Sequence, residues 1–424
     1  MNVPSPAEPV GDCTLRGNGR IAEASEVTET VRMRRSRELD LGHILRAQAT
    51  VAAVPSDLTA TVALEAGDRT WTSHIQEGRM EVTEGLPERP TVRIIADPET
   101  VAGVVTGARS GIEEFLAGRL KARGNLALAL RLDSIFSPNG HHERWPRWRS
   151  VRARGVHTVY LEAGRGPHVV LLHGLGATNA SMLTTMWDLA RDHHVVAPDL
   201  PGFGDSGKPI RAYHAGFYAA WLADFLSRIG IHRAHLVGNS MGGRVAIELG
   251  LRDPAVVERM VLLAPAPAFI KNREYVRLVR ILRPELALLP LPISHRNVVR
   301  SIRIMFSRPS RVPVAWFEAA ADEFLRVFST PRGRIAFFSA ARQIYLEEPR
   351  GEHGFWDRLP SLSRPALFVW GERDRLVPAK FARHVETALP KATSVVLVDC
   401  GHVPQYELPD RTHQLIREFL GSSA

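Results

Sequence analysis

The amino-acid sequence predicts a doubly wound α/β fold with a mostly parallel sheet and a helical cap, preceded by a small α+β domain. Three observations support this prediction. From Val156 onward, short apolar runs alternate with helical patterns, as expected where helices cover both faces of a parallel sheet. Residues 58–96 instead carry closely spaced short strands, and helical patterns follow them. A glycine-bracketed serine, Ser240, lies where one apolar run meets a helical pattern.

The composition is that of an ordinary globular protein. The chain has 424 residues, enough for two domains, of which 45% are hydrophobic and 23% charged. Its two cysteines, Cys13 and Cys400, form no CxxC pattern, and the sequence has no apolar run typical of a signal peptide or a membrane span, so we expect a cytoplasmic protein. The net charge of +9 would suit an anionic membrane surface or nucleic acid, but a codon bias toward arginine is the simpler explanation.

The first third of the chain predicts a tail followed by a small domain. Residues 1–37 are rich in Pro, Gly, Ser, Glu and Arg without a regular period, which indicates a disordered or loosely attached tail. Periodic patterns then predict a helix at 40–51 and four short strands that we expect to form an antiparallel sheet. Asp97-Pro98 indicates the start of a helix. The strands are expected at 58–66, 70–75, 79–84 and 91–96, and later helices at 101–106, 113–117 and 126–136, with a short strand within 118–125.

Three stretches of this region resemble a known family. They are the Ile94-Ile95-Ala96-Asp97 junction, the Phe115-Leu116-Ala117-Gly118-Arg119-Leu120 step, and Arg123-Gly124-Asn125-Leu126 leading into Leu132-Asp133-Ser134-Ile135-Phe136. On these residues, 38–138 resembles the sterol carrier protein-2-like lipid-binding domains. The resemblance implies a helix layer on a sheet around an apolar tunnel for an acyl chain or sterol, without catalytic residues. A packed domain that serves only as a scaffold or dimer interface is the alternative.

Residues 139–155 are expected to form a basic linker that interleaves arginine with tryptophan. Such a segment would suit a membrane interface or a nucleic acid. The simpler interpretation is that its tryptophans, Trp145 and Trp148, pack between the two domains.

The remainder of the chain, residues 156–424, predicts a sheet of buried parallel strands with crossover helices. Besides the apolar run before Ser240, strands are expected at 156–162, 169–172, 195–198, 260–263, 366–370 and 394–398. A helix at 214–229 would place on one face the side chains of Phe217, Trp221, Phe225 and Ile229.

Ser240 lies in the pattern Gly238-Asn239-Ser240-Met241-Gly242, which predicts a nucleophile elbow. The chain would turn from strand to helix so sharply that the serine adopts a strained conformation. We expect Gly238 and Gly242 to be glycines because strand and helix pass too close for a side chain. The Ser240 hydroxyl would stand free above the sheet. The N–H of Met241, at the helix N-terminus, would point at an oxyanion formed beside it.

Two later loops supply an acid and a histidine, because Asp374 and His402 each follow a predicted strand. Since the carboxyl ends of parallel strands meet at one edge of a sheet, both side chains are expected to lie near Ser240. Asp399 is an alternative partner for His402, but it falls at the strand end itself. Cys400 is expected to be an inert neighbour.

Residues 156–421 resemble the α/β-hydrolase fold. The resemblance rests on His173-Gly174, Asp199-Leu200-Pro201-Gly202-Phe203-Gly204-Asp205-Ser206, the elbow, Gly371-x-x-Asp374 and Gly401-His402, in the chain order of that family.

The chemistry of these residue types indicates their roles. His402 would take the proton of Ser240 during attack, and Asp374 would fix the tautomer of the imidazole. The oxyanion would accept hydrogen bonds from the N–H groups of Met241 and of Leu175, which follows His173-Gly174. His173 is expected to support this loop rather than to move a proton.

The stretch from about 266 to 360 is an insertion that fits a helical cap over the site. Helices are expected at 275–282, 298–306, 314–328 and 334–346. Its aromatic side chains would line an apolar site, and its arginines would hold a carboxylate or lie on an anionic membrane. Alternatively, the aromatic side chains pack the cap on the core and the arginines face solvent.

The sequence therefore predicts a serine hydrolase, without cofactor or metal, that cleaves a hydrophobic carboxylic ester through an acyl-enzyme on Ser240. A serine here excludes the relatives that use an aspartate nucleophile. Hydrolysis of a carbon–carbon bond in a diketone is the alternative, although the loop at 173–178 departs from the His-Gly-x-Gly-Pro-Gly form typical of that group. A non-catalytic lipid-transfer protein is an alternative of another class. The expected partner is a hydrophobic small molecule or lipid, with peripheral membrane contact as an option and no nucleic acid; the oligomeric state is left open.

Overall fold

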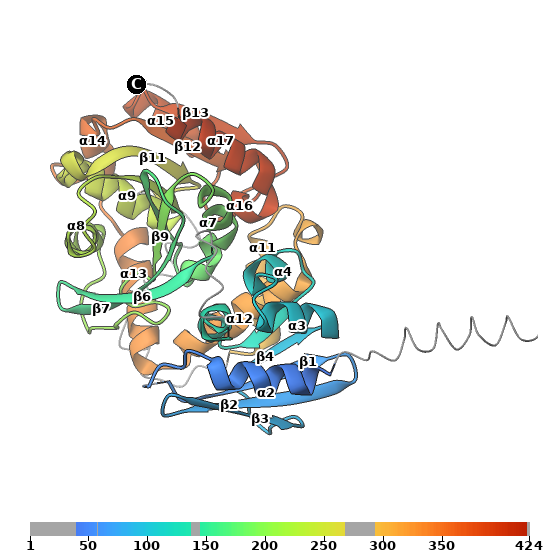
Figure 1. The fold of residues 1–424 in the computed structure, drawn as a ribbon. Helices are drawn as coiled ribbons and strands as arrows, with labels where there is room; N and C mark the ends of the chain where they lie inside the picture. Colours follow the sequence, from blue (N-terminus) through green and yellow to red (C-terminus); the bar gives the residue numbers. More distant parts are fainter. Residues whose placement is uncertain (1–39, 57, 137–144, 268–292, 422–424) are drawn as a thin grey trace, which may run out of the picture.

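The computed structural model describes residues 40–56, 58–136, 145–267 and 293–421 (Figure 1). The predicted tail at 1–37 and the predicted cap helix at 275–282 lie outside these described residues. The described chain forms a five-stranded sheet in the N-terminal domain and an eight-stranded sheet in the remainder.

The N-terminal domain is built on a sheet with the strand order β3-β2-β1-β4-β5. Its strands are β1 (Ala60–Ala66), β2 (Arg69–Gln76), β3 (Arg79–Glu84), β4 (Val92–Ala96) and β5 (Lys121–Gly124). β1, β2 and β3 pair antiparallel, but β4 runs parallel to β1. The expectation of a purely antiparallel sheet is therefore wrong. The connection after β3 passes β2 and β1 and returns to the end of the sheet at which β1 starts. β4 therefore runs beside β1 in the same direction.

The helices of this domain are α2 (Leu41–Val51), α3 (Pro98–Val105), α4 (Gly111–Leu116), α5 (Leu126–Ala129) and α6 (Leu132–Phe136). α3 begins where the sequence predicts, because Asp97 Oδ1 accepts a hydrogen bond from Thr100 N at 2.9 Å. The single helix expected at 126–136 is instead two short helices. The N–H of Arg131 bonds to the carbonyl of Leu128, three residues back, and this tighter turn ends α5.

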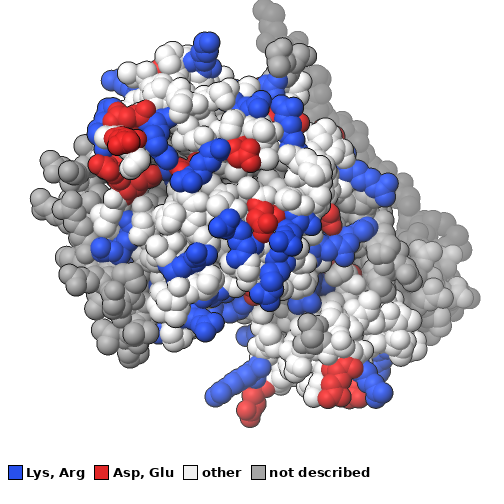
Figure 2. Space-filling model, turned by 90° about the vertical axis from the view of Figure 1, so that its left-hand side faces the viewer, with Lys and Arg blue, Asp and Glu red and all other residues white. Residues whose placement is uncertain are grey.

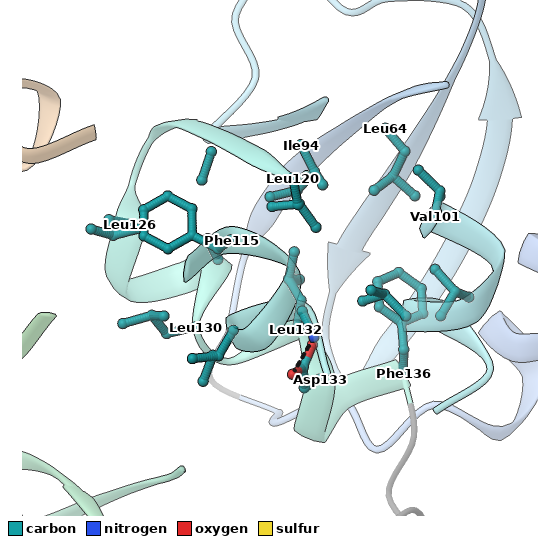
Figure 3. A pocket seen from close by; sticks show the side chains of 16 residues that line it. Leu64, Ile94, Val101, Phe115, Leu120, Leu126, Leu130, Leu132, Asp133 and Phe136 are labelled. Carbon is teal, nitrogen blue, oxygen red and sulfur yellow. Dashed lines mark hydrogen bonds between the residues drawn. The ribbon is translucent and has the colours of Figure 1, made fainter. Parts of the chain in front are cut away.

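An apolar pocket lies between the sheet and the helices of this domain (Figure 3). Its free volume of about 30 Å³ is on the order of one water molecule. Asp133 contributes a carboxylate to the wall of this pocket and accepts a hydrogen bond from Gly111 N at 2.9 Å. Burial raises the pKa of Asp133 to about 7. The apolar side chains of the wall include Leu64, Ile94, Val101, Phe115, Leu126 and Phe136.

The second sheet has the order β13-β12-β11-β10-β8-β9-β7-β6. β8 to β13 pair in parallel, whereas β6 and β7 form an antiparallel hairpin at one edge. The strands are β6 (Arg147–Ala153), β7 (Val156–Ala163), β8 (His168–Leu172), β9 (His194–Pro198), β10 (Ala234–Asn239), β11 (Val257–Leu263), β12 (Ala366–Gly371) and β13 (Thr393–Leu397).

The hairpin corrects the expected linker at 139–155, because Arg147–Ala153 form β6 of the large sheet. The turn to β7 consists of Arg154 and Gly155, with φ values of 44° and 75°. Two positive φ values are the mark of a type I′ hairpin, and Arg-Gly is a less familiar signal for it than Asn-Gly. Trp148 of β6 faces the N-terminal domain, where the Arg131 guanidinium lies 4.1 Å above its ring.

Helices cover both faces of the large sheet (Figure 1), which confirms the doubly wound fold. α7 (Leu183–Leu189) and α17 (Pro409–Gly421) cover one face, and the other carries α8 (Ala215–Arg228), α9 (Met241–Arg252) and α15 (Phe381–Ala388). Alternate side chains of β8 accordingly enter different cores, with Val169 and Leu171 on the α7 side and Val170 and Leu172 on the α9 side.

The described part of the cap contains α11 (His295–Ile304), α12 (Val314–Phe328) and α13 (Pro331–Tyr345). α12 has the bounds expected from the sequence, whereas α11 and α13 begin earlier because Ser294 and Thr330 act as N-caps. α12 also contacts the N-terminal domain (Figure 1), where Arg123 Nε donates to Asp322 Oδ2 at 2.7 Å.

On the face drawn in Figure 2, Lys and Arg side chains are scattered among acidic and uncharged ones and form no continuous basic surface there. Within the described ranges, we find no helix with the length and apolar character that crossing a membrane requires.

We expect Asp133→Asn to change how stability depends on pH. The folded-state pKa of about 7 lies above the usual value of 3.8, so between these values the folded protein holds a proton that the unfolded chain releases. Rising pH therefore lowers the stability of the wild type through this window. Asparagine does not titrate, so the free energy of unfolding of the variant relative to wild type should rise from about pH 4 to pH 7, by on the order of a few kcal/mol, and then level off. A constant difference across thermal melts at pH 4.5 to 8 would contradict this.

Candidate active site

Ser240 stands at a sharp turn between β10 and α9, with φ 53° and ψ −113°. A positive φ is strained for a residue with a side chain, so the surrounding structure must hold it. The Ser240 N–H donates to Leu263 O at 2.9 Å, and its carbonyl accepts from Ala266 N at 3.0 Å. The neighbouring strand β11 and the chain after it thus hold the serine backbone on both sides.

The two glycines that flank the serine allow β10 and α9 to approach one another. A Cβ on Gly242 would lie 2.1 Å from the Leu172 carbonyl oxygen. A Cβ on Gly238 would lie 2.5 Å from the backbone of Gly242. Both contacts are with backbone atoms, which cannot move aside as a flexible side chain could. These distances agree with the expectation that strand and helix pass too close for a side chain at either glycine.

Asp374 and His402 are joined by a hydrogen bond of 2.7 Å between Asp374 Oδ2 and His402 Nδ1. Both residues are buried, and the second oxygen of Asp374 accepts from the backbone N–H groups of Leu376 and Val377 at 2.8 and 2.9 Å. A carboxylate with these donors accepts from Nδ1–H, which assigns the tautomer in which His402 Nε2 carries the lone pair.

The residue before the serine connects the elbow to this pair. Asn239 Nδ2 donates to Leu263 O at 3.0 Å and to His402 O at 3.1 Å. The position of the histidine backbone is therefore set directly by the elbow. Among the described residues, the Ser240 hydroxyl makes no hydrogen bond of its own to His402; such bonds often tighten only when substrate is bound.

The loop after β8 lies beside the serine. A Cβ on Gly174 would lie 3.5 Å from Ser240 Cβ, which places the backbone of this loop in contact with the elbow. In the part of the chain that the structure describes, neither Leu175 N–H nor Met241 N–H donates a hydrogen bond. These two free donors near Ser240 are suited to stabilise a developing negative charge.

His173 has a structural position beneath this loop. Its Nε2 accepts from Leu200 N at 2.9 Å, so its Nδ1–H donates to Gly174 O at 2.8 Å. The side chain is fully buried, and desolvation lowers its pKa to about 4. A neutral imidazole with both nitrogens occupied supports the loop and has no free nitrogen for proton transfer.

Asp399, the alternative acid, lies in a different environment. It accepts from Ser307 Oγ at 3.1 Å and forms ion pairs with Arg308, Arg311 and Arg373. Its hydrogen bonds and ion pairs among the described residues do not include His402. The adjacent Cys400 is buried, and burial raises the pKa of its thiol to about 12, so it stays protonated.

Two buried carboxylates hold the loops around the site, although their sequence positions predicted no such role. Asp199 accepts from Asn179 N and Asp205 N, at 2.8 and 2.9 Å, and burial raises its pKa to about 7. Glu407, in α16 (Pro404–Glu407), accepts from the N–H groups of Gly401, Ser307 and Arg308. Asp199 belongs to a recognisable motif, but nothing local to Glu407 in the sequence indicates donors a hundred residues away.

A small apolar pocket lies where the cap meets the loop after β8. It is lined by Gly176 and Ala177 of this loop and by Phe324 and Phe328 of α12 and Phe337 of α13. The rings of the last three are in mutual contact, with centroids 5.1 to 5.7 Å apart. Its free volume is about 10 Å³, so the aromatic side chains nearly fill it.

Comparison with protein families gives two matches. Residues 167–409 match the model of the alpha/beta hydrolase fold, and residues 42–137 match that of the SCP-2 sterol transfer family.

Individual relatives match the larger domain. A pimeloyl-[acyl-carrier protein] methyl ester esterase of Aeromonas hydrophila subsp. hydrophila is 30% identical, over 61% of this chain and 97% of the relative. A 2-hydroxymuconate semialdehyde hydrolase of Pseudomonas sp. (strain CF600) is 26% identical, over 65% and 94%. The solved structure of a membrane phospholipase A, a bacterial virulence factor, superimposes with a TM-score of 0.56 at 28% identity, covering 76% of this chain and 94% of that one.

We expect Gly242→Ala to destabilise the protein by about 3 kcal/mol or more, because the added methyl group would meet the Leu172 carbonyl at 2.1 Å. Gly421→Ala is the matched control. Gly421 ends α17 with open space around it, so alanine should leave the melting temperature unchanged or raise it slightly. Thermal unfolding of both variants checks the prediction, and equal melting temperatures would contradict it.

Proposed function

Because this chain belongs to the α/β hydrolase fold family and carries a domain of the SCP-2 sterol transfer family, we propose that it is a serine hydrolase of hydrophobic carboxylic esters. The observation that carries the proposal is the Asp374–His402 hydrogen bond, linked through Asn239 to the elbow of Ser240. These contacts support Ser240 as the nucleophile, His402 as the base and Asp374 as the orienting acid, the three roles that acyl transfer requires.

In this mechanism Ser240 Oγ attacks the ester carbonyl carbon while His402 Nε2 accepts its proton. The N–H groups of Leu175 and Met241 hold the negative charge on the carbonyl oxygen, and Asp374 stabilises the imidazolium. His402 then gives the proton to the alcohol oxygen as the bond to carbon breaks, which leaves an acyl-enzyme on Ser240. Water attacks this intermediate with the same base, and the carboxylic acid is released.

The preference for an apolar substrate rests on two features. The described cap presents Phe324, Phe328 and Phe337 next to the loop of Leu175, and apolar walls of this kind favour acyl chains over polar groups. The fused N-terminal domain has an apolar pocket of its own. Two of the similar proteins, by their names, are an esterase and a phospholipase, which supports ester cleavage. We expect the protein to be cytoplasmic. Peripheral contact with a membrane surface would give it access to a lipid ester as substrate.

Carbon–carbon bond hydrolysis is the second candidate, favoured by the similarity to a 2-hydroxymuconate semialdehyde hydrolase. The loop at 173–178 lacks the His-Gly-x-Gly-Pro-Gly form typical of diketone hydrolases, so we place the ester first. A non-catalytic lipid-transfer role would leave the Asp374–His402 bond and the strained Ser240 without a purpose.

We expect the purified protein to hydrolyse p-nitrophenyl esters, with kcat/KM at least about tenfold higher for octanoate than for acetate. Each buried methylene is worth up to about 0.8 kcal/mol, so six added groups exceed this ratio even when only partly buried. Ser240→Ala is the control for background hydrolysis. Faster turnover of a 2-hydroxy-6-oxo-dienoate than of any ester would favour the carbon–carbon alternative. The absence of all turnover would favour a lipid-transfer protein.

Asp374→Asn should lower kcat by about 10⁴-fold, because an amide at this position favours the wrong tautomer of His402. Asp399→Asn is the matched control, since it removes a nearby carboxylate that binds arginines instead, and it should retain activity within about tenfold of wild type. Steady-state hydrolysis of p-nitrophenyl butyrate by both variants checks the assignment. Similar losses in the two variants would mean that Asp374 is not the orienting acid.

A further inference from the structure

The wall of the N-terminal pocket touches the cap directly. Phe115 lines this pocket, and its carbonyl oxygen accepts a hydrogen bond from Trp316 Nε1 at 2.9 Å. The two rings are stacked, with centroids 6.2 Å apart and planes 25° apart. Trp316 lies in the first turn of α12, so any displacement of Phe115 acts on this cap helix.

Charged contacts fix α12 to the same domain at a second point. Arg123 of β5 pairs with Asp322 at 2.7 Å and with Glu318 at 3.3 Å, and the N–H of Gly124 donates to Asp322 at 2.9 Å. Asp322 is largely shielded from solvent, with 15% of its side chain exposed. With these contacts, β5 and α12 are expected to move together.

Other residues of α12 face the hydrolase domain. Phe324 and Phe328 contact the pocket beside Gly176, in the loop that carries Leu175. The helix is therefore a wall shared by the N-terminal domain and the surroundings of the elbow. The pocket beside Gly176 has almost no free volume in this structure, and a displacement of α12 away from this loop would enlarge it.

Trp316 also reaches the histidine loop. Its ring lies edge-on to Tyr406 with centroids 4.8 Å apart. The next residue, Glu407, is buried and accepts from Gly401 N at 2.7 Å and from Ser307 N at 3.1 Å. The N–H of His402 itself donates to the carbonyl of Met305, at the end of α11. Hydrogen bonds to backbone groups thus connect the cap to the histidine loop.

The N-terminal pocket cannot admit a lipid without moving its walls. Its free volume of about 30 Å³ is on the order of one water molecule, far below the volume of an acyl chain. Because close-packed walls shift together rather than deform smoothly, entry of a chain must displace side chains such as Phe115.

We propose that the N-terminal pocket is an effector site at which a single-chain lipid activates the hydrolase through Phe115, Trp316 and α12. Lipid binding displaces Phe115, shifts α12 and opens the space beside the Leu175 loop. The proposal rests on the serine hydrolase function proposed above. Linkage requires the converse as well, so a ligand that stabilises the shifted cap strengthens lipid binding.

The test uses the full-length protein with p-nitrophenyl octanoate, whose acyl chain needs the space beside the Leu175 loop, and palmitate as the probe. Saturating palmitate should raise kcat/KM by at least about fivefold. Trp316→Phe keeps an aromatic ring but loses the hydrogen bond to Phe115, and it should reduce this activation to less than twofold while palmitate still binds. Trp71→Phe is the matched control, because the Trp71 indole nitrogen has no hydrogen-bond partner among the described residues and does not line the pocket.

Turnover without palmitate tests the proposed function, and the effect of palmitate tests the effector site. Hydrogen exchange of residues 314–328 in Ser240→Ala, with and without palmitate, gives a readout that needs no catalysis. A change in exchange that Trp316→Phe abolishes supports the proposal even if no ester is turned over. Bound palmitate without any change in rate or exchange would overturn it, as would failure of palmitate to bind. A fall in rate that is equal in Trp316→Phe would indicate competition at Ser240 and would also overturn it.

Discussion

The site depends on one backbone constraint, the passage of α9 so close to β8 and β10 that no side chain fits at Gly238 or Gly242. This approach forces Ser240 to a φ of 53°, a conformation that an isolated chain would rarely adopt. The strain persists because hydrogen bonds to Leu263 and Ala266 hold the serine from both sides. The turn that exposes the hydroxyl therefore depends on the packing of the whole sheet.

A second principle concerns the loops at the carboxyl ends of the strands. The loops after β8, β9, β10 and β13 are held by buried polar side chains that bind backbone groups of other segments. His173 does so as a neutral imidazole, and Asn239 as an amide that reaches the carbonyl of His402. Glu407 and Asp199 do so as buried carboxyls that accept from backbone N–H groups. Because buried polar groups are costly when left without partners, these contacts restrict each loop to one arrangement.

The sequence was most informative where function and fold depend on local pattern. Apolar runs followed by Ser240, Asp374 and His402 indicate strand ends, and the structure joins the last two by a hydrogen bond. Pairing over long distances was not predictable, since the direction of β4 depends on where the chain re-enters the sheet. The β6 strand was hidden because Arg-Gly is an uncommon turn sequence and because three of the seven strand residues are arginine. The role of Glu407 depends on Ser307, which only the folded cap brings near.

The hairpin of β6 and β7 affects how the two domains can be separated. β6 covers one side of β7, and its backbone hydrogen bonds pair residues 147–153 with 156–162. A hydrolase domain cut at the sequence-based boundary of 156 would begin with a bare β7, whose unpaired N–H and C=O groups would invite another chain to add a strand. It would also lose Trp148, which lies under Arg131 of the N-terminal domain. β6 thus belongs to the hydrolase domain through its backbone hydrogen bonds and contacts the N-terminal domain through Trp148. With both contacts in place, we expect the two domains to rotate little relative to each other.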